Sequence, residues 1–166
     1  MGDRMQLTGE KAIVAPPDVV WTALIDPEFL KALIPGCESM TGSPETGYDI
    51  TVARQVGGMT ARLTGFFDLS EVEPGHGCVL SGGGSGGGAG HAKGTARIRL
   101  VPEGQGTRLS WDLAAELGGK LASLPNFVVR LAAQKVADGF IERFAAAIEK
   151  RPATKKKGWL GRIGGS

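Results

Sequence analysis

The chain has 166 residues, enough for one domain with a substantial core. Its apolar fraction of 42% and charged fraction of 22% are typical of soluble proteins, and no run approaches the ~20 apolar residues that a membrane span needs. The charged N-terminus predicts no secretory signal. Cys37 and Cys78 have no CxxC partner, so we expect buried free thiols in a reducing compartment.

Charge is distributed unevenly along the chain. The part before Lys150 holds all 17 acidic residues and 13 Lys and Arg, a net charge of −4. Residues 150–166 hold six Lys and Arg and no acid, a net charge of +6. A mildly acidic body disfavours a nucleic-acid-binding domain. We therefore expect a folded domain over residues 1–150, a flexible basic tail over 151–166, and no nucleic-acid partner.

The first part of the chain predicts one strand and two short helices. The strand covers residues 6–14, and the Pro-Pro-Asp sequence that follows opens the first helix. Asp26 and Pro27 interrupt that helix, and Asp26 is placed to cap a second helix over residues 27–32. We expect Trp21 to lie on the buried face of the first helix.

Apolar and polar residues alternate through most of the middle of the chain, and this alternation predicts half-buried strands. A glycine tract over residues 82–90 interrupts this pattern. It predicts a mobile or bulged hairpin at the rim, or alternatively a loop that gates a pocket. Its GxGxxG match precedes no helix, which disfavours phosphate binding. Six antiparallel strands are expected over residues 38–41, 48–56, 59–70, 78–81, 92–101 and 107–117.

The last predicted element is a long amphipathic helix. Apolar residues recur at steps of three and four between Lys120 and Lys150, with Pro125 in the first turn and Pro152 after the end. We expect about 26 helical residues once the N-terminal turn is subtracted. Only this helix is large enough to cover the apolar sheet face. The predicted class is α+β, with a curved antiparallel sheet around a C-terminal helix and two short helices after strand one.

Small residues are frequent on the predicted inner face of the sheet, including Gly65, Gly94 and Ala96. Protein interiors leave few voids, so the helix must either approach unusually closely or leave a pocket, and we favour a pocket. Such pockets are lined mostly by apolar groups. The predicted ligand-contacting residues are Leu33, Ile34, Val52, Leu63, Phe67, Trp111, Leu124, Phe127 and Leu131. Trp111 is expected to serve in the core as well.

No residue pattern indicates catalysis or metal binding. His76 and His91 are isolated, and no Cys/His cluster or inward pair of carboxylates is evident. Tyr48 and Arg54 share the inward face of one predicted strand and are the only polar candidates for an enzyme of cyclase or hydrolase type. We expect a non-catalytic protein without a metal or a covalently bound cofactor.

The basic tail combines charge with apolar residues that favour membrane interfaces. Each basic residue near an anionic leaflet adds ~1 kcal/mol, and a polybasic patch with a small apolar element suits reversible anchoring. The alternative is a disordered solubilising extension. The residues predicted to contact an anionic membrane surface are Lys155, Lys156, Lys157, Trp159, Leu160, Arg162 and Ile163.

Several short sequence motifs are spread over residues 5–150. They are GE at 9–10, APPDVVW at 15–21, LIDP at 24–27, IPGC at 34–37, the glycine tract ending AGHAKG at 89–94, GTRL at 106–109 and GGKLA at 118–122. In these motifs the chain resembles the family of the CoxG subunit of carbon monoxide dehydrogenase, in the START/Bet v 1-like (SRPBCC) helix-grip superfamily. The Pro-Gly-Cys element and the glycine tract are the more specific parts.

The resemblance implies a helix-grip fold with an apolar cavity between helix and sheet. It also implies a bound quinone or other lipid, and a role beside a molybdenum hydroxylase of the carbon monoxide dehydrogenase type. The implied location is cytoplasmic and peripheral, at the inner face of the cytoplasmic membrane. Two alternatives remain open, a membrane-recruitment or assembly adaptor with a vestigial pocket and a helix-grip enzyme. The short tail, without a long amphipathic helix, departs from the family pattern.

Overall fold

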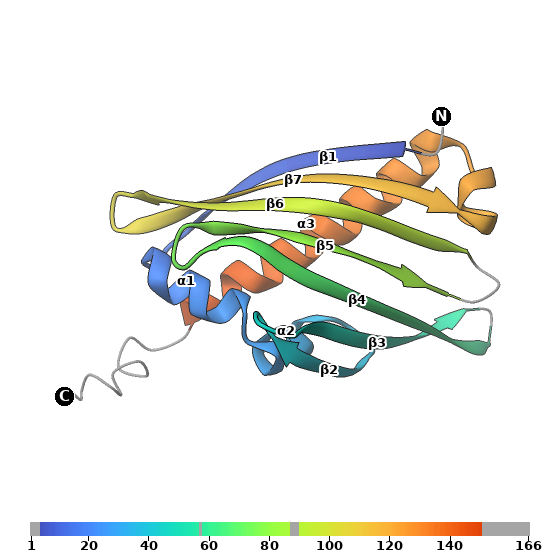
Figure 1. Ribbon diagram of the computed structural model, residues 1–166, viewed down its shortest axis with the longest axis horizontal. Helices are drawn as coiled ribbons and strands as arrows, with labels where there is room; N and C mark the ends of the chain where they lie inside the picture. Colours follow the sequence, from blue (N-terminus) through green and yellow to red (C-terminus); the bar gives the residue numbers. More distant parts are fainter. Residues whose placement is uncertain (1–3, 57, 87–89, 151–166) are drawn as a thin grey trace.

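The computed structural model describes residues 4–56, 58–86 and 90–150, apart from the side chains of residues 4, 54–56 and 59–61. The elements follow the predicted order (Figure 1). They are β1 (Arg4–Ile13), α1 (Pro17–Leu24), α2 (Pro27–Leu33), β2 (Cys37–Ser43), β3 (Gly47–Val56), β4 (Met59–Glu73), β5 (Gly77–Ser85), β6 (His91–Glu103), β7 (Gly106–Gly118), the 3-10 helix η2 (Gly119–Ser123) and α3 (Asn126–Lys150).

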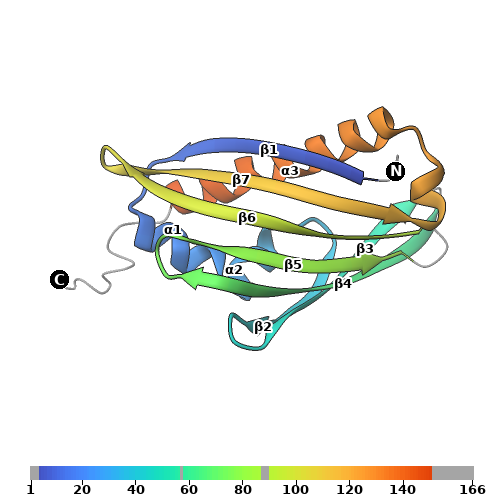
Figure 2. The ribbon, with the colours of Figure 1, turned by 45° about the horizontal axis from the view of Figure 1, so that its top comes forward.

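The strands form one antiparallel sheet of seven strands in the order β1-β7-β6-β5-β4-β3-β2. Consecutive strands from β2 to β7 are neighbours, and β1 pairs with β7 at one edge. The sheet curves, and α1, α2 and α3 lie on its concave side (Figures 1 and 2). This arrangement confirms the predicted α+β class and the order of its elements.

Local signals set the ends of the short helices. The Asp26 side chain accepts hydrogen bonds from the backbone N–H groups of Glu28 and Phe29 at 3.0 and 3.3 Å, which caps α2 as predicted. Pro27 occupies the first turn of α2, where a missing N–H costs nothing. Together α1 and α2 close one end of the curved sheet (Figure 2).

The first half of the glycine tract is strand rather than loop, so the predicted hairpin joins β5 to β6 by a shorter connection than expected. Residues 82–85 continue β5, where Gly82 pairs with Phe67 on one side and with Gly94 on the other. A Cβ at Gly82 would meet the backbone oxygen of Phe66 and lie 2.7 Å from the Cα of Phe67. Only glycine therefore permits this close approach of the strands. The gating loop that was predicted for the tract lies partly outside the described residues, at 87–89.

The long helix α3 has 25 residues and begins directly after Pro125, close to the predicted length. It is held against the β1 edge of the sheet by polar contacts along its length. Arg130 Nη1 donates to the backbone oxygen of Gln6 at 2.8 Å, and Lys11 Nζ lies 3.1 Å from Glu142 Oε2. The backbone N–H of Val14 donates to Glu149 Oε2 at 2.9 Å. These contacts fix α3 nearer to β1 than to β3.

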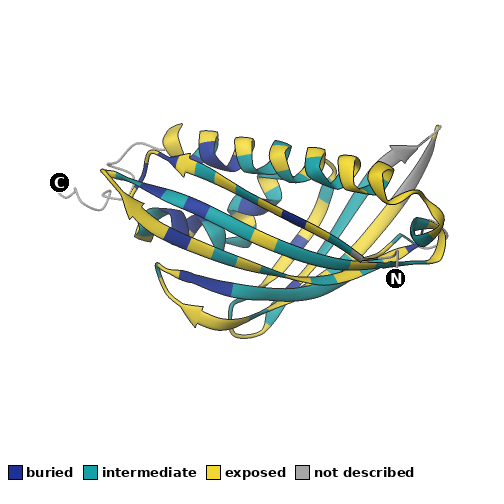
Figure 3. Ribbon diagram, turned by 90° about the horizontal axis from the view of Figure 1, so that it is seen from above, coloured by how far each residue is buried: buried dark blue, intermediate teal, exposed yellow. Residues whose placement is uncertain are grey.

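The core lies where the end of α3 meets α1, α2 and the sheet. Phe144, Ile13, Leu109 and Val20 are almost completely buried there. Thr107 is buried among them, and its hydroxyl donates a 2.7 Å hydrogen bond to the backbone oxygen of Ala15. Figure 3 shows the buried residues of α3 gathered near its C-terminal end. The opposite half of α3 is mainly exposed.

Candidate functional site

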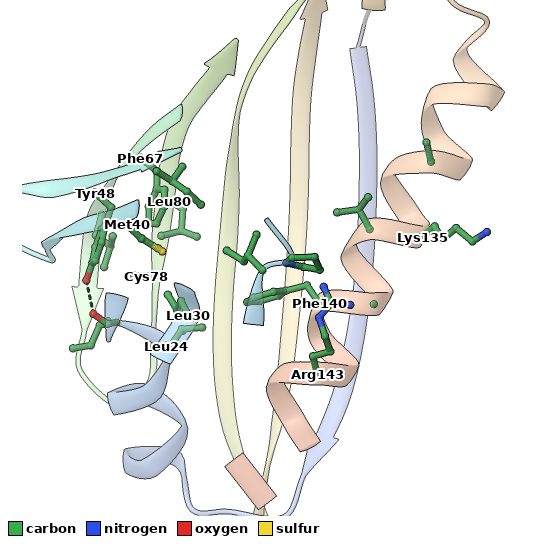
Figure 4. A pocket seen from close by; sticks show the side chains of 18 residues that line it. Leu24, Leu30, Met40, Tyr48, Phe67, Cys78, Leu80, Lys135, Phe140 and Arg143 are labelled. Carbon is green, nitrogen blue, oxygen red and sulfur yellow. Dashed lines mark hydrogen bonds between the residues drawn. The ribbon is translucent and has the colours of Figure 1, made fainter. Parts of the chain in front are cut away.

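A large cavity of about 730 Å³ lies between α3 and the strands farthest from β1. It has the size typical of small-molecule sites, roughly 300–1,000 Å³. Side chains from the sheet, from α1 and α2, and from α3 surround it (Figure 4). Its sheet wall consists of Met40, Tyr48, Ile50, Phe67, Leu69, Cys78 and Leu80. Its closed end consists of Leu24, Ile25, Leu30, Ile34 and Pro35.

The position of α3 explains why this space is open. Contacts to Gln6, Lys11 and Val14 hold the helix at the β1 edge, while the sheet continues to curve through β5, β4 and β3. Helix and sheet therefore diverge on the β3 side, where no other element fills the gap within the described part of the chain. The short side chains that α3 presents there, Ala132 and Gly139, widen the space further.

Tyr48 supplies the largest polar group of the sheet wall, but this group already has a partner. The side chain is 2% exposed, and its hydroxyl donates a 2.7 Å hydrogen bond to the backbone oxygen of Ile25. Its ring stacks on Phe67 with centroids 4.9 Å apart. Burial, with a smaller effect of Glu45 and Asp26, raises the pKa of Tyr48 above its ordinary value. The wall is therefore neutral and effectively apolar.

Cys78 is the other group of the wall with some polarity. Its side chain is buried, as predicted, whereas Cys37 is half-buried and donates to the backbone oxygen of Ser39 at 3.3 Å. Burial raises the pKa of the Cys78 thiol, so the group stays protonated at neutral pH and behaves as a small apolar residue.

The charged groups of the cavity lie on α3, at its open side. This wall is formed by Ala132, Lys135, Val136, Gly139, Phe140 and Arg143. Arg143 is exposed, and its Nε donates a 2.8 Å hydrogen bond to the backbone oxygen of Leu33 at the end of α2. Its Nη1 lies 3.2 Å from where a Cβ of Gly139 would stand, so the guanidinium folds over this glycine. The cavity thus has an apolar interior and a cationic rim.

Two of the sequence-predicted ligand residues, Ile34 and Phe67, line this cavity. Leu33 and Trp111 are half-buried and pack against the core instead. A Cβ on Gly9 would collide with the indole ring of Trp111, so this ring lies over β1, away from β3. This supports the core role expected for Trp111. Val52 is half-buried, Leu63 is 39% exposed, and neither lines the cavity.

The structure corrects the predicted inward orientation of three further residues. Leu124, Phe127 and Leu131 are 44%, 66% and 66% exposed and do not line the cavity. The reason is that α1 and α2 cover the concave side only near the C-terminal half of α3 (Figure 2). The periodic pattern identifies an apolar helix face, but it does not reveal which part of that face has a partner. Their part in ligand binding stays a prediction.

Most of the cavity wall was not among the predicted residues. Ile50 in β3 and Leu69 in β4 alternate with polar residues, so alternation alone could have found them, whereas Leu80 in β5 has no such pattern around it. The contributions of Met40, Ala132 and Gly139 carry no comparable signal, because they depend on where α2 and α3 are placed.

The other sequence predictions concern metal binding, catalysis and membrane contact. The described residues contain no cluster of three or more His, Cys, Asp or Glu side chains that could hold a metal ion. Of the two polar candidates for an enzyme, Tyr48 is engaged by Ile25, and the side chain of Arg54 is outside the described part. The tail residues predicted to touch a membrane, 155–163, also lie outside it. No helix of the described chain is long and apolar enough to span a bilayer.

The fold is shared with several solved structures of low sequence identity. A conserved protein from Geobacillus kaustophilus has a TM-score of 0.79 at 23% identity, over 88% of this chain and 96% of that chain. An uncharacterized protein from Rhizobium leguminosarum has a TM-score of 0.68 at 14% identity, over 89% and 96%. Ara h 8.0201 has a TM-score of 0.64 at 18% identity, over 89% and 99%. These similarities show a helix-grip fold of the Bet v 1-like type.

No curated protein matches the chain. The family model of the CoxG subunit of carbon monoxide dehydrogenase matches residues 9–149, a range that runs from β1 to the next-to-last residue of α3 and includes every residue that lines the cavity. Since this match covers most of the 166 residues, the chain belongs to the carbon monoxide dehydrogenase CoxG family.

Proposed function

We propose that this protein is a non-catalytic accessory protein of a molybdenum hydroxylase of the carbon monoxide dehydrogenase type. In this role it binds an apolar, lipid-like ligand, a quinone, in the cavity beneath α3. The single observation that carries the proposal is the apolar cavity of about 730 Å³ with charged groups only at its rim. Family membership supports the enzyme partner, because the family is named as a subunit of that enzyme.

The chemistry of the wall favours a ligand with a long apolar part and a small polar head. An interior of Leu, Ile, Phe and Met offers dispersion contacts but almost no hydrogen bonds, so a buried polar head would lose its water without compensation. Arg143 at the rim is a donor, whereas the ammonium group of Lys135 points away from the other side chains that line the cavity (Figure 4). Quinone carbonyl oxygens accept hydrogen bonds, so the head lies at the rim and the apolar chain lies inside.

A head group at the rim is also the useful orientation for electron transfer. The partner enzyme supplies two electrons, water supplies two protons, and the quinone leaves as the quinol. The protein's own residues bind and orient the ligand in this scheme and take no part in bond making. We place the protein in the cytoplasm, peripheral at the inner face of the cytoplasmic membrane, where quinones reside.

An adaptor function is the second candidate, and the basic tail favours it. Residues 150–166 carry a net charge of +6 against −4 for the body, which suits attraction to an anionic surface. In this version the protein recruits the hydroxylase to the membrane, and the cavity is vestigial. Reversing the tail charges by K155E/K156E/K157E is then expected to remove the hydroxylase from the membrane fraction. Loss of the ligand from the cavity is expected to leave this recruitment unchanged.

The carrier proposal is tested by blocking the cavity. Ala132 is exposed and lines the cavity, so the indole of Ala132→Trp can enter the space without disturbing the core. Ala146→Trp is the matched control, since Ala146 is exposed on the same helix and does not line the cavity. Binding of decylubiquinone is measured by equilibrium dialysis for the wild type and both variants.

We expect the wild type and Ala146→Trp to bind decylubiquinone equally, and Ala132→Trp to bind at least about tenfold more weakly, about 1.4 kcal/mol. Equal binding by all three proteins would place the ligand outside this cavity. Absence of binding in the wild type would leave only the adaptor function.

A further inference from the structure

The N-terminal half of α3 presents an apolar surface that no described element covers. We call it the α3 apolar face and define it as Phe127, Val128, Leu131 and Val136 of α3 together with Leu124, which lies just before the helix. Their exposed fractions range from 40% for Val128 to 69% for Val136. Contiguous exposed apolar patches on soluble domains mark interaction sites.

Helical spacing makes this face continuous. Phe127, Leu131 and Lys135 form one row at steps of four along α3, and Val128, Ala132 and Val136 form a second row beside it. The second row leads into the cavity, because Ala132 and Val136 are both part of the cavity wall. The exposed surface and the cavity opening are therefore one apolar path.

The charges within residues 117–137, the segment that holds the face, have a single sign, and Glu116 and Asp138 flank this segment. Residues 117–137 contain Lys120, Arg130 and Lys135 and no Asp or Glu, a net charge of +3 within an otherwise acidic body. All three cations are exposed. None of the ion pairs in the described part of the chain includes any of them. The C-terminal half of α3 differs, since Asp138, Glu142 and Glu149 follow there.

We propose that the α3 apolar face is a docking surface for an anionic lipid bilayer. The exposed apolar side chains enter the headgroup boundary, while Lys120 and Lys135 contact anionic headgroups and Arg130 stays bonded to the backbone oxygen of Gln6. A bilayer at this surface meets the cavity opening directly, so a lipid-like ligand passes between the two without crossing water. The choice of cargo rests on the proposed function, whereas the docking surface rests on exposure and charge alone.

This surface is separate from the basic tail. Lys150, where the tail begins, lies at the opposite end of α3 (Figure 1). A helix of 25 residues at 1.5 Å per residue is about 37 Å long, so the α3 apolar face and the start of the tail are distinct sites. The bilayer is favoured over a protein partner because a mixture of apolar and exclusively basic residues matches an anionic lipid surface, while protein interface cores are depleted in charge.

The test uses the full-length protein and flotation with two kinds of vesicle, phosphatidylcholine alone and phosphatidylcholine with phosphatidylglycerol. The double variant F127S/L131S removes two exposed apolar side chains of the face. The control is Phe66→Ser, since Phe66 is 55% exposed on β4 with its side chain on the convex side of the sheet. K155E/K156E/K157E measures the tail's contribution separately. Binding of decylubiquinone without vesicles reports the state of the cavity.

We expect binding to phosphatidylglycerol vesicles by the wild type, a loss of about tenfold in F127S/L131S, and a change below about twofold in Phe66→Ser. Unchanged vesicle binding in F127S/L131S would overturn the inference. The inference would also be overturned if the wild type does not bind vesicles and F127S/L131S instead weakens binding to the hydroxylase or self-association. A wild type that docks through this face but binds no decylubiquinone would contradict the carrier function and leave the docking surface standing.

Discussion

The hydroxyl group of Tyr48 donates a 2.7 Å hydrogen bond to the backbone carbonyl of Ile25, which ties β3 to the end of α1 at the closed end of the cavity. The ring of Tyr48 forms part of the cavity wall, but its polar atom is occupied by this contact. The bond therefore does two things at once, since it closes the cavity and keeps its surface apolar.

Removing this hydrogen bond is expected to destabilise the fold. Tyr48→Phe leaves the ring stacked on Phe67 and deprives the Ile25 carbonyl of its partner. The expected loss is about 1 kcal/mol in the free energy of unfolding, the usual net value of such a bond. Urea denaturation measures it, and a variant as stable as the wild type would show that the bond contributes nothing.

The pKa of Tyr48 gives a pH prediction with a clean readout, because Tyr48 is the only tyrosine in the sequence. Burial raises its pKa above 10, so above that pH the unfolded chain loses the proton before the folded protein does. Stability is then unaffected by Tyr48 below about pH 10 and falls as the pH rises through the raised pKa. Ultraviolet titration of phenolate should show a midpoint above 10 in the folded protein and a lower one in urea. Equal midpoints would contradict the buried environment.

Two phenylalanines on α3 test the position of this helix. Phe144 is fully buried with ring centroids 6.0 Å from Phe29 and 5.9 Å from Phe140, whereas Phe127 is 66% exposed. Phe144→Ala is expected to cost about 3–5 kcal/mol of unfolding free energy, and Phe127→Ala about 0.5 kcal/mol or less. Similar losses measured by denaturation would mean that the N-terminal half of α3 is packed rather than exposed.

Features set by contacts between neighbours in the chain were predicted better than features set by contacts between distant residues. Asp26 and Pro125 set helix boundaries through contacts with their chain neighbours, so these boundaries were predicted correctly. The glycine strand was mistaken for a loop because glycine carries no alternating pattern, although Gly82 pairs regularly with Phe67 and Gly94.

The sequence predicts an apolar pocket between the helix and the sheet, but it does not predict most of the residues that line the cavity. Small residues such as Gly94 and Ala96 favoured a pocket, and a cavity is present, but neither of these residues lines it. Which side chains surround the space depends on the placement of α3, and that is set by Arg130 with Gln6 and by Lys11 with Glu142. Each of these pairs is separated by more than 120 residues, beyond the reach of any local pattern.

Arg143 at the rim is expected to hold the ligand's polar head. Arg143→Ala should weaken decylubiquinone binding by roughly fivefold, about 1 kcal/mol for an exposed charge-assisted hydrogen bond. Binding of N-phenylnaphthylamine, an apolar probe without carbonyl groups, should change much less. Lys150→Ala is the control, since Lys150 is exposed on the same helix away from the cavity. An equal loss for both ligands would indicate that Arg143 acts through Leu33 and the position of α2 instead.

The most direct measurement is native mass spectrometry of the full-length protein purified without detergent, followed by solvent extraction of whatever it carries. The account predicts a protein population one quinone heavier than the bare chain, with the quinone recovered in the extract, and no such population for Ala132→Trp. A wild type found only as the bare chain, and unchanged in mass after incubation with decylubiquinone, would contradict the carrier function.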